Sequence, residues 1–324
     1  MANIEKRPIG TSKLKVAPLA LGGNVFGWTA DEPTSFRILD AFVDAGGNMI
    51  DTADVYSAWV PGHQGGESEA IIGRWLKRDP SKRQKVVIAT KVGYYDGKII
   101  DGEYVPALDP AVIVKSCDAS LERLGIDTID VYYQHKDDLK VPLAESLKTF
   151  DDLAKAGKIK AIGLSNFEPD RFAEACIIAR VDGFPAVSAF QPWYNMMERG
   201  KYEGALRDVA IKEGLGVFPF YSLANGFLTG KYRSKDDLKK SVRGGRSEQY
   251  LEGKGPKVLA ALEEVAAETG AVLASVALAW TAAQPTITAP IASATSVEQV
   301  DELIASMTLE LSDDQLARIS EASA

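Results

Sequence analysis

The most constraining feature of this sequence is a regular alternation of two kinds of segment along the chain. Short apolar runs rich in β-branched residues alternate with longer segments of helical period, which is the pattern of βαβ units in a parallel sheet. Strands are predicted at 16–21, 49–51, 86–91, 129–134, 159–164, 186–190, 216–219 and 286–290. Helices are predicted at 34–45, 67–78, 109–124, 142–156, 169–181, 201–213, 256–269, 272–283 and 296–306. An eightfold α/β alternation favours a (β/α)8 TIM barrel over a doubly wound sheet.

The domain organisation follows from length and from the segments that lie outside this alternation. A chain of 324 residues gives a prior of about two domains, but barrels run past 200 residues as one domain. No Pro/Gly/Ser-rich linker interrupts the pattern, so a single domain over 1–324 is expected. Segment 4–14 is predicted as a β-hairpin that caps the bottom of the barrel. Segment 230–256 is predicted as a long loop on the C-terminal face, either a lid facing an anionic ligand or a mobile solvated loop.

Composition excludes several classes of function. The two cysteines, Cys117 and Cys176, and the two histidines, His63 and His135, are too few for a disulfide framework or a three-histidine zinc site, so no metal is expected. A net charge of −8 and a pI near 5.1 argue against nucleic acid as a partner. The N-terminus lacks a signal-peptide core, and no stretch approaches the roughly 20 apolar residues of a membrane span. A cytoplasmic protein is therefore expected, and no feature specifies an oligomeric state.

Four polar residues stand where barrel enzymes carry their sites, at the carboxyl ends of strands. Asp51 ends the second predicted strand, Lys91 ends the third, His135 follows the fourth, and Tyr56 lies five residues past Asp51. Three of them have a structural explanation by themselves: the acid as a helix cap, the lysine as an ion-pair partner, the histidine as a core residue. Together they favour a functional site. Removing a lysine and an acid from water costs on the order of several kcal/mol of desolvation free energy, so such a buried pair usually serves a purpose.

These residue types suit the protonation of an alkoxide. Lys91, held by Asp51, is expected to lower the pKa of the Tyr56 hydroxyl from its ordinary value of about 10, and His135 is expected to donate a hydrogen bond to the same substrate oxygen. Such an alkoxide arises when hydride adds to a carbonyl. No side chain supplies hydride, so a nicotinamide cofactor is implied.

The sequence resembles the aldo-keto reductases over nearly its whole length. The matching motifs are LALGGNVFG at 19–27, NMIDTADVYS at 48–57, ATKVG at 89–93, DVYYQHKD at 130–137, IGLSNF at 162–167, FQPWYN at 190–195 and FYSLANGFLTGKY at 220–232. The resemblance implies that Asp51, Tyr56, Lys91 and His135 form the family's catalytic tetrad, with tyrosine as the general acid. It also implies a cofactor bound without a Rossmann fold, and no G-x-G-x-x-G motif occurs here.

The resemblance further assigns residues to the cofactor. The implied contacts along the nicotinamide and pyrophosphate are Gly22, Asn24, Asp51, Ser165, Asn166, Gln191, Tyr221, Ser222, Leu223, Gly226 and Lys231. Among them Ser165, Asn166 and Gln191 match positions that hydrogen-bond the carboxamide, and Tyr221 matches the aromatic that stacks on the nicotinamide ring.

The adenosine end departs from the family pattern. Thr295 stands near the position that usually carries a cation for the 2′-phosphate, a main source of NADP preference. Ser293, Thr295 and Gln299, with backbone donors at the helix start, remain candidates for phosphate binding. NADP is therefore expected as the cofactor, with NAD possible.

The predicted function is NAD(P)H-dependent, reversible reduction of small aldehydes or ketones to alcohols. Trp28, Trp59, Trp193 and Tyr94 lie on predicted C-terminal-face loops, where they either line an apolar substrate pocket or pack the loops together. Two alternatives stay open. One is a cofactor-binding, redox-sensing barrel subunit with slow turnover, and the other is a Schiff-base aldolase with Lys91 as nucleophile.

Overall fold

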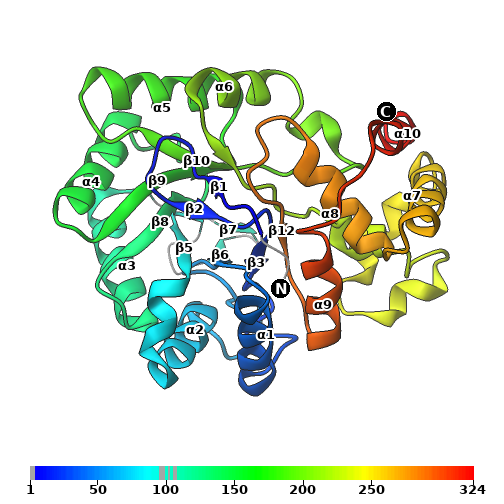
Figure 1. Cartoon of the computed structure of the whole chain (residues 1–324). Helices are drawn as coiled ribbons and strands as arrows, with labels where there is room; N and C mark the ends of the chain where they lie inside the picture. The colour runs from blue at the N-terminus through cyan, green and yellow to red at the C-terminus, as the bar shows by residue number, and fades with distance from the viewer. Residues whose placement is uncertain (1–3, 95–98, 101–102, 105–107) are drawn as a thin grey trace.

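A computed structural model describes residues 4–94, 99–100, 103–104 and 108–324 and contains a barrel of parallel strands (Figure 1). The strands are β3 (Ala20–Gly22), β4 (Met49–Asp51), β5 (Val87–Val92), β8 (Ile129–Gln134), β9 (Ile159–Ser165), β10 (Val187–Gln191), β11 (Gly216–Val217) and β12 (Ile291–Ala292). Their order in the sheet is β11-β10-β9-β8-β5-β4-β3-β12. A parallel bridge from Val217 to Ile287, with Thr288 N donating to Val217 O at 2.9 Å, joins the two ends of the sheet. The predicted (β/α)8 barrel is confirmed.

Two strands differ from the prediction at the ends of the barrel. Pro18 cannot donate a ladder hydrogen bond, so the first barrel strand begins at Ala20, and Val16 belongs to the hairpin. Within the predicted eighth strand at 286–290, Ile287 forms the bridge to Val217. The residues of β12, which pair with β3, follow Pro290. Proline thus shifts both boundaries.

The predicted hairpin covers one end of the barrel and faces the viewer in Figure 1. Its strands, β1 (Arg7–Pro8) and β2 (Lys15–Val16), pair antiparallel. Ile9 is fully buried among the side chains that fill the barrel interior. Gly10 has φ +48°, and a Cβ there would lie 2.2 Å from Ser188 O, so glycine is needed at this turn. Arg7 Nη1 donates to Ala282 O at 2.8 Å and to Ile287 O at 3.2 Å, which ties the hairpin to the last part of the barrel.

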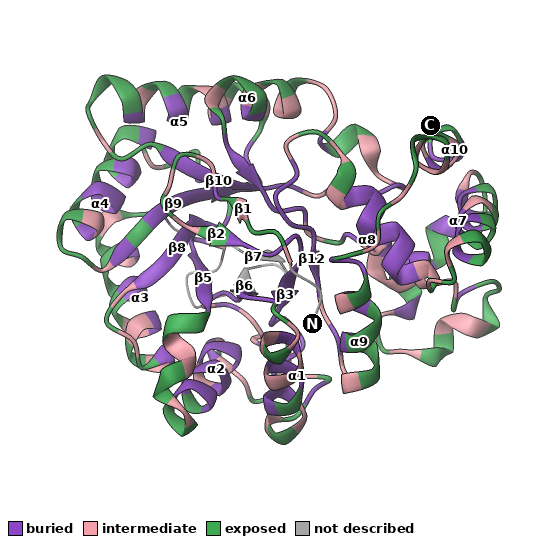
Figure 2. Ribbon diagram, in the orientation of Figure 1, coloured by how far each residue is buried: buried purple, intermediate pink, exposed green. Residues whose placement is uncertain are grey.

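Helices surround the sheet and bury the side that faces it (Figure 2). They are α1 (Glu32–Asp44), α2 (Glu67–Arg78), α3 (Pro110–Leu124), α4 (Leu143–Lys155), α5 (Pro169–Val181), α6 (Ala205–Glu213), α7 (Gly255–Thr269), α8 (Leu273–Ala283), α9 (Val297–Ala305) and α10 (Asp313–Ala322). Asp109 caps α3 by accepting from Ala111 N at 2.9 Å. Helix α10 was not predicted, although Ser312 and Gln315 form a capping box at its start.

No single helix in the described part of the chain is long and apolar enough to cross a membrane. Helices α7 and α8 reach that length only as a pair, and the pair is bent by 98°.

The long segment 230–256 is folded against the barrel. It contains two 3₁₀ helices, η4 (Asp236–Lys240) and η5 (Gly244–Tyr250), which follow η3 (Ala224–Thr229). Two further 3₁₀ helices, η1 (Pro80–Lys85) and η2 (Arg199–Lys201), and a two-stranded sheet of β6 (Ile99–Ile100) and β7 (Glu103–Tyr104) complete the described elements. Tyr232 and Tyr250 anchor the segment, because both are buried and the Tyr250 hydroxyl donates to Glu198 Oε1 at 3.0 Å. The segment is therefore part of the packed structure.

Candidate active site

Asp51, Tyr56, Lys91 and His135 converge at the carboxyl ends of three adjacent strands. In the parallel register Asp51 pairs with Ala89, two residues before Lys91, and Lys91 itself pairs with Tyr133, two residues before His135. The three strand ends therefore lie side by side. The Tyr56 and His135 ring centroids are 6.1 Å apart, in an edge-to-face arrangement. The predicted convergence of these four residues is present in the structure.

Lys91 is the centre of the cluster. Its Nζ donates to Asp51 Oδ2 at 2.7 Å, to the Thr52 carbonyl at 2.8 Å and to the Tyr56 hydroxyl at 2.9 Å. An ammonium has three protons, so all its donors are used. The lysine side chain is 0% exposed, and the Asp51 side chain is 2% exposed. The pair thus lies in a medium where its charges interact strongly and where losing either one is costly.

The second oxygen of Asp51 is held from across the barrel. Gln191 Nε2, at the end of β10, donates to Asp51 Oδ1 at 2.8 Å. The resemblance placed Gln191 among the residues that bind a carboxamide, and its amide nitrogen is instead directed to the carboxylate in this structure. Both oxygens of Asp51 therefore accept hydrogen bonds, which fixes the orientation of the carboxylate.

The pKa of Tyr56 does not follow the expectation from sequence. Burial raises the pKa of the Tyr56 hydroxyl well above its ordinary value, and the nearby negative charge of Asp51 raises it further. The prediction that Lys91 lowers this pKa is wrong for this structure, because desolvation of the phenolate and the Asp51 charge outweigh the ammonium. Tyr56 is therefore a neutral phenol that retains its proton for donation.

Burial also sets the charge of the other two titrating groups. Burial lowers the pKa of Lys91, and the Asp51 charge opposes that shift. The pKa of His135 lies well below its ordinary value, first because the ring is buried and second because Lys91 is positive. A neutral imidazole carries one N–H donor, which suits it to hydrogen-bond an oxygen rather than to transfer a proton.

The position of His135 is fixed through its backbone and its ring. Its backbone N–H donates to Val92 O at 2.8 Å, and its backbone carbonyl accepts from Asn166 Nδ2 at 2.8 Å. The Tyr94 ring lies 4.7 Å from the imidazole between centroids. His135 Nδ1 is buried with no hydrogen-bond partner among the described residues. The imidazole is therefore packed in one place while part of its hydrogen-bonding capacity remains unused.

The residues assigned to the nicotinamide lie beside this cluster. Ser165 Oγ donates to Gln191 O at 2.8 Å, and Asn166 Nδ2 approaches Ser165 Oγ at 3.1 Å. Tyr221 has φ +55° and is 36% exposed, and its carbonyl accepts from Asn195 Nδ2 at 2.9 Å. Asn195 was not among the predicted site residues. An exposed aromatic ring fixed by its backbone is well suited to stack on a flat heteroaromatic ring.

The next turn provides features that suit a pyrophosphate. Left-handed backbone occurs at Ala224, Asn225 and Gly226. A Cβ on Gly226 would lie 3.1 Å from Lys231 Nζ, so the lysine amine lies over this backbone. Turns of this kind, whose successive backbone N–H groups form a concave nest, are typical of phosphate sites, and a nearby cation adds to them. Ser222 Oγ already donates to Pro219 O at 2.9 Å, and Leu223 packs against the core, so these two residues can contribute only their backbone groups and remaining lone pairs.

The residues predicted at the adenosine end form two separate groups. Ser293 Oγ donates to Asn24 Oδ1 at 2.5 Å, and a Cβ on Gly22 would lie 2.5 Å from the same hydroxyl. Thr295 N donates instead to Gln299 Oε1 at 2.9 Å, at the start of α9. The first group joins β3 to the segment after β12, whereas the second stays within the beginning of α9.

The four aromatic residues predicted on the C-terminal-face loops, Trp28, Trp59, Trp193 and Tyr94, each lie against another ring of the site. The Trp28 and Trp59 rings are 5.5 Å apart, and Trp59 is 6.1 Å from Tyr56. On the other side, Trp193 lies 5.3 Å from Tyr221. These rings, with Tyr94, surround the polar cluster with apolar surface.

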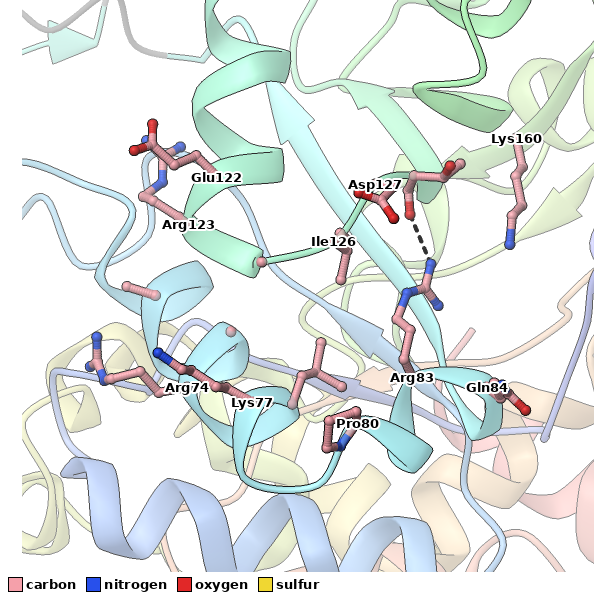
Figure 3. Close-up of a pocket in the computed structure, with 15 residues that line it drawn as sticks. Arg74, Lys77, Pro80, Arg83, Gln84, Glu122, Arg123, Ile126, Asp127 and Lys160 are labelled. Atoms are coloured by element: carbon pink, nitrogen blue, oxygen red, sulfur yellow. Dashed lines mark hydrogen bonds between the residues drawn. The ribbon is translucent and has the colours of Figure 1, made fainter.

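A groove of about 900 Å³ lies elsewhere, on the outside of the barrel between α2, η1 and the end of α3 (Figure 3). Its basic side chains are largely neutralised, since Arg83 pairs with Asp130 at 2.9 Å and Arg123 pairs with Glu69 at 2.6 Å. It includes none of the predicted site residues. The polar cluster at the strand ends is therefore the stronger candidate for chemistry.

Comparison with known proteins agrees with this geometry. The model of the aldo/keto reductase family matches residues 18–324. The chain is similar to the uncharacterized oxidoreductase YrpG of Bacillus subtilis, with 33% identity over 97% of this chain and 94% of the relative. It is 30% identical to the aldo-keto reductase AMT2 of Alternaria alternata, over 97% of this chain and 90% of the relative. It is 28% identical to the L-glyceraldehyde 3-phosphate reductase of Escherichia coli K12, over 98% of this chain and 92% of the relative. The chain therefore belongs to the aldo-keto reductase family of oxidoreductases.

Proposed function

We propose that this protein reversibly reduces small aldehydes or ketones to alcohols with NAD(P)H and that Tyr56 is the general acid. The observation that carries the proposal is the hydrogen-bond chain from Asp51 through Lys91 to the Tyr56 hydroxyl, at 2.7 and 2.9 Å. The Escherichia coli relative is named for the reduction of an aldehyde, which supports this reaction class.

The chain's own residues account for the proton. Lys91 donates to the Tyr56 oxygen, and this polarises the phenolic O–H as a donor to the substrate oxygen. As the proton leaves, the ammonium of Lys91 stabilises the phenolate at a distance of one hydrogen bond. Asp51 keeps Lys91 charged despite its burial. In the reverse direction the same phenolate accepts the proton of an alcohol.

His135 orients the carbonyl in this proposal. The neutral ring stands edge-on to Tyr56, so both can address one oxygen from different sides. The surrounding aromatic rings exclude water and strengthen these hydrogen bonds. A nicotinamide dinucleotide, when bound, would supply the hydride.

The residues present suit that cofactor. Tyr221 offers an exposed ring, Ser165 and Asn166 offer polar groups, and Lys231 beside Gly226 offers a cation over a left-handed backbone turn. We propose NADP as the cofactor, with NAD as an alternative because Thr295 replaces the expected cation near α9. Fluorescence titration with NADPH and NADH in parallel tests this, and failure of both to bind would contradict the proposal.

A Schiff-base aldolase is less well supported by the geometry. A nucleophilic lysine needs a free amine that can reach a carbonyl. Lys91 is fully buried and uses all three N–H groups within the site.

The proton role is tested by Tyr56→Phe. With 4-nitrobenzaldehyde and saturating NADPH, this variant is expected to lose about 10²- to 10⁴-fold in kcat, the usual contribution of a positioned acid. Tyr132→Phe is the matched control. It removes a buried hydroxyl that has no partner among the described residues, and the Tyr132 ring stacks on Phe150, away from the site. Stopped-flow oxidation of bound NADPH, compared with the steady-state rate, separates an enzyme from a slow redox-sensing subunit. Full turnover by Tyr56→Phe would refute the assigned role.

A further inference from the structure

Two buried threonine side chains lie beside the Asp51–Lys91 pair, on the side of the sheet that faces the helices. Thr52 follows Asp51 and Thr90 precedes Lys91, so the alternation of a strand turns both away from the barrel interior. Thr90 shares its face with Ile88, which packs in the core under the helices. Both threonines are 0% exposed. A buried hydroxyl without a hydrogen bond is costly, and both hydroxyls find their partner in the first turn of α2.

Ser68 holds the first threonine. Thr52 Oγ1 donates to Ser68 Oγ at 2.8 Å, and Ser68 Oγ donates to Gly23 O at 2.8 Å. A Cβ on Gly23 would lie 2.8 Å from Ser68 Oγ, so this close approach requires glycine. Thr52 also supplies the carbonyl that accepts from Lys91 Nζ at 2.8 Å. Ser68 is therefore joined to the lysine ammonium through a single residue, Thr52.

Glu69 holds the second threonine. Thr90 Oγ1 donates to Glu69 Oε1 at 2.5 Å, and Arg123 Nε donates to Glu69 Oε2 at 2.7 Å. The Glu69 side chain is 0% exposed, whereas that of Arg123, in the last turn of α3, is 30% exposed (Figure 3). A buried ion pair contributes little net stability, because removing the charges from water offsets their attraction. Stability alone is therefore a weak reason for an acid at this position, and the fixed position of Thr90 is a better one.

These contacts matter because the Lys91 ammonium has to be placed accurately. Its long side chain brings Nζ to 2.9 Å from the Tyr56 hydroxyl and to 2.7 Å from Asp51. The side chain starts at the end of β5, and two of its acceptors lie at the end of β4. Thr90 and Thr52 tie these two strand ends to α2. A misplacement of about 1 Å in a reacting group can cost about 10²-fold in rate.

We propose that Ser68 and Glu69 are positioning residues for Lys91. Ser68 acts through Thr52, and Glu69 acts through Thr90. This inference rests on the proposed function, because it concerns the lysine that supports proton donation, and it extends the functional site to the first turn of α2. Since both residues act through another one, their loss is expected to slow the chemical step while the binding of NADPH and of the carbonyl stays unchanged.

The test removes each hydrogen bond with little change in shape. Ser68→Ala removes the acceptor of the Thr52 hydroxyl, and Thr90→Val removes the donor to Glu69. With 4-nitrobenzaldehyde and bound NADPH, the single-turnover rate constant from stopped flow is expected to fall about tenfold in each variant, between the effect of one hydrogen bond and that of a misplacement of about 1 Å. Partial misfolding would lower the amplitude of this reaction and leave its rate constant unchanged. Thr90→Ser keeps the hydroxyl and should keep the rate constant within about threefold of the wild type.

Matched controls come from buried hydroxyls on α8. Ser275 lies in the first turn of that helix and donates to Glu302 O at 2.6 Å, and Thr281 donates to Ala277 O at 2.9 Å. Ser275→Ala and Thr281→Val remove the same groups as the test variants, and their rate constants should equal that of the wild type. In every variant the Kd for NADPH and the KM for the aldehyde should stay within about twofold. A similar fall of the rate constant in the controls would overturn the proposal.

A second measurement follows Lys91 without any turnover. In protein labelled with ¹⁵N-lysine, a buried and hydrogen-bonded ammonium gives its own ¹H–¹⁵N signal, which Lys91→Met identifies by its loss. Ser68→Ala and Thr90→Val are each expected to speed the hydrogen exchange of this ammonium about tenfold, because a group that is held less firmly opens more often.

The outcomes separate this proposal from the proposed function. Unchanged hydrogen exchange of the Lys91 ammonium in both variants would overturn the positioning role, even where Tyr56→Phe abolishes reduction and so supports the proposed function. Faster exchange in both variants, together with a wild type that does not oxidise NADPH with any carbonyl, would support the positioning role and refute the proposed function.

Discussion

The buried pair of Lys91 and Asp51 predicts a large and pH-dependent effect of removing one charge. In Asp51→Asn the ammonium of Lys91, which is 0% exposed, loses its counter-charge at 2.7 Å. Breaking a buried pair in this way costs about 3–5 kcal/mol of unfolding free energy, because the remaining charge is left desolvated. Asp51→Asn is therefore expected to unfold at a clearly lower urea concentration at pH 7.

The pH dependence follows from the direction of the Lys91 shift. Burial already lowers the pKa of Lys91 in the folded protein, and Asp51→Asn removes the charge that opposes this shift. The unfolded chain then binds a proton that the folded chain releases, so the destabilisation is greatest at low pH. It shrinks as pH rises toward the unfolded pKa of about 10.4, by at most about 1.4 kcal/mol per pH unit.

The double variant Asp51→Asn/Lys91→Met isolates the cause. It removes the unpaired charge and is expected to recover a large part of the lost stability. Urea unfolding followed by tryptophan fluorescence and by circular dichroism measures all three proteins. Asp152→Asn is the control, because its pair with Lys148 is more than half exposed on both sides and should cost less than about 1 kcal/mol. A loss below about 1 kcal/mol in Asp51→Asn, or a double variant no more stable than the single one, would show that this reasoning is wrong.

Three other predictions concern separate parts of the molecule. Burial lowers the pKa of His135, so the unfolded chain binds a proton below pH 6.5 that the folded chain does not. Between pH 6.5 and 5.5 the unfolding free energy of the wild type, measured with urea, should therefore fall by about 1 kcal/mol more than that of His135→Gln. An equal fall for both proteins would contradict this. A Cβ on Gly163 would lie 2.3 Å from the Tyr133 ring, so Gly163→Ala should lower the unfolding free energy by about 1–3 kcal/mol through overpacking, and an unchanged urea midpoint would count against it. Thr295→Arg adds a cation at the start of α9 and should tighten NADPH binding about tenfold with NADH unchanged, as measured by fluorescence titration; an equal gain for both cofactors would argue against a 2′-phosphate contact.

The barrel and the polar cluster were predictable because both depend on local pattern. The strand predicted at 49–51 and the helix predicted at 67–78 have the same bounds in the structure. Parallel strands with apolar sequences place their carboxyl ends at one edge, so residues that follow those strands meet without any further information.

Features that depend on depth or on distant contacts were not predictable. The hydrogen bond from Gln191 to Asp51 joins residues 140 positions apart, and no local pattern signals it. The direction of the Tyr56 shift depends on how deeply the hydroxyl is buried, which the sequence does not show. Segment 230–256 folds through short 3₁₀ helices and two buried tyrosines, which leave no helical or strand period in the sequence.

The hairpin has a consequence for synthesis of the chain. Arg7 donates hydrogen bonds to the carbonyls of Ala282, Ile287 and Thr288, the last of them 281 residues away. At about 5–20 residues per second, the ribosome needs roughly 14 to 56 s to add that length. During this time the nascent hairpin has no barrel end to cover, and Ile9 has no complete interior to enter. Contacts that join the two ends of a chain so late make folding slow, so the barrel is sealed only after nearly all of it has been translated.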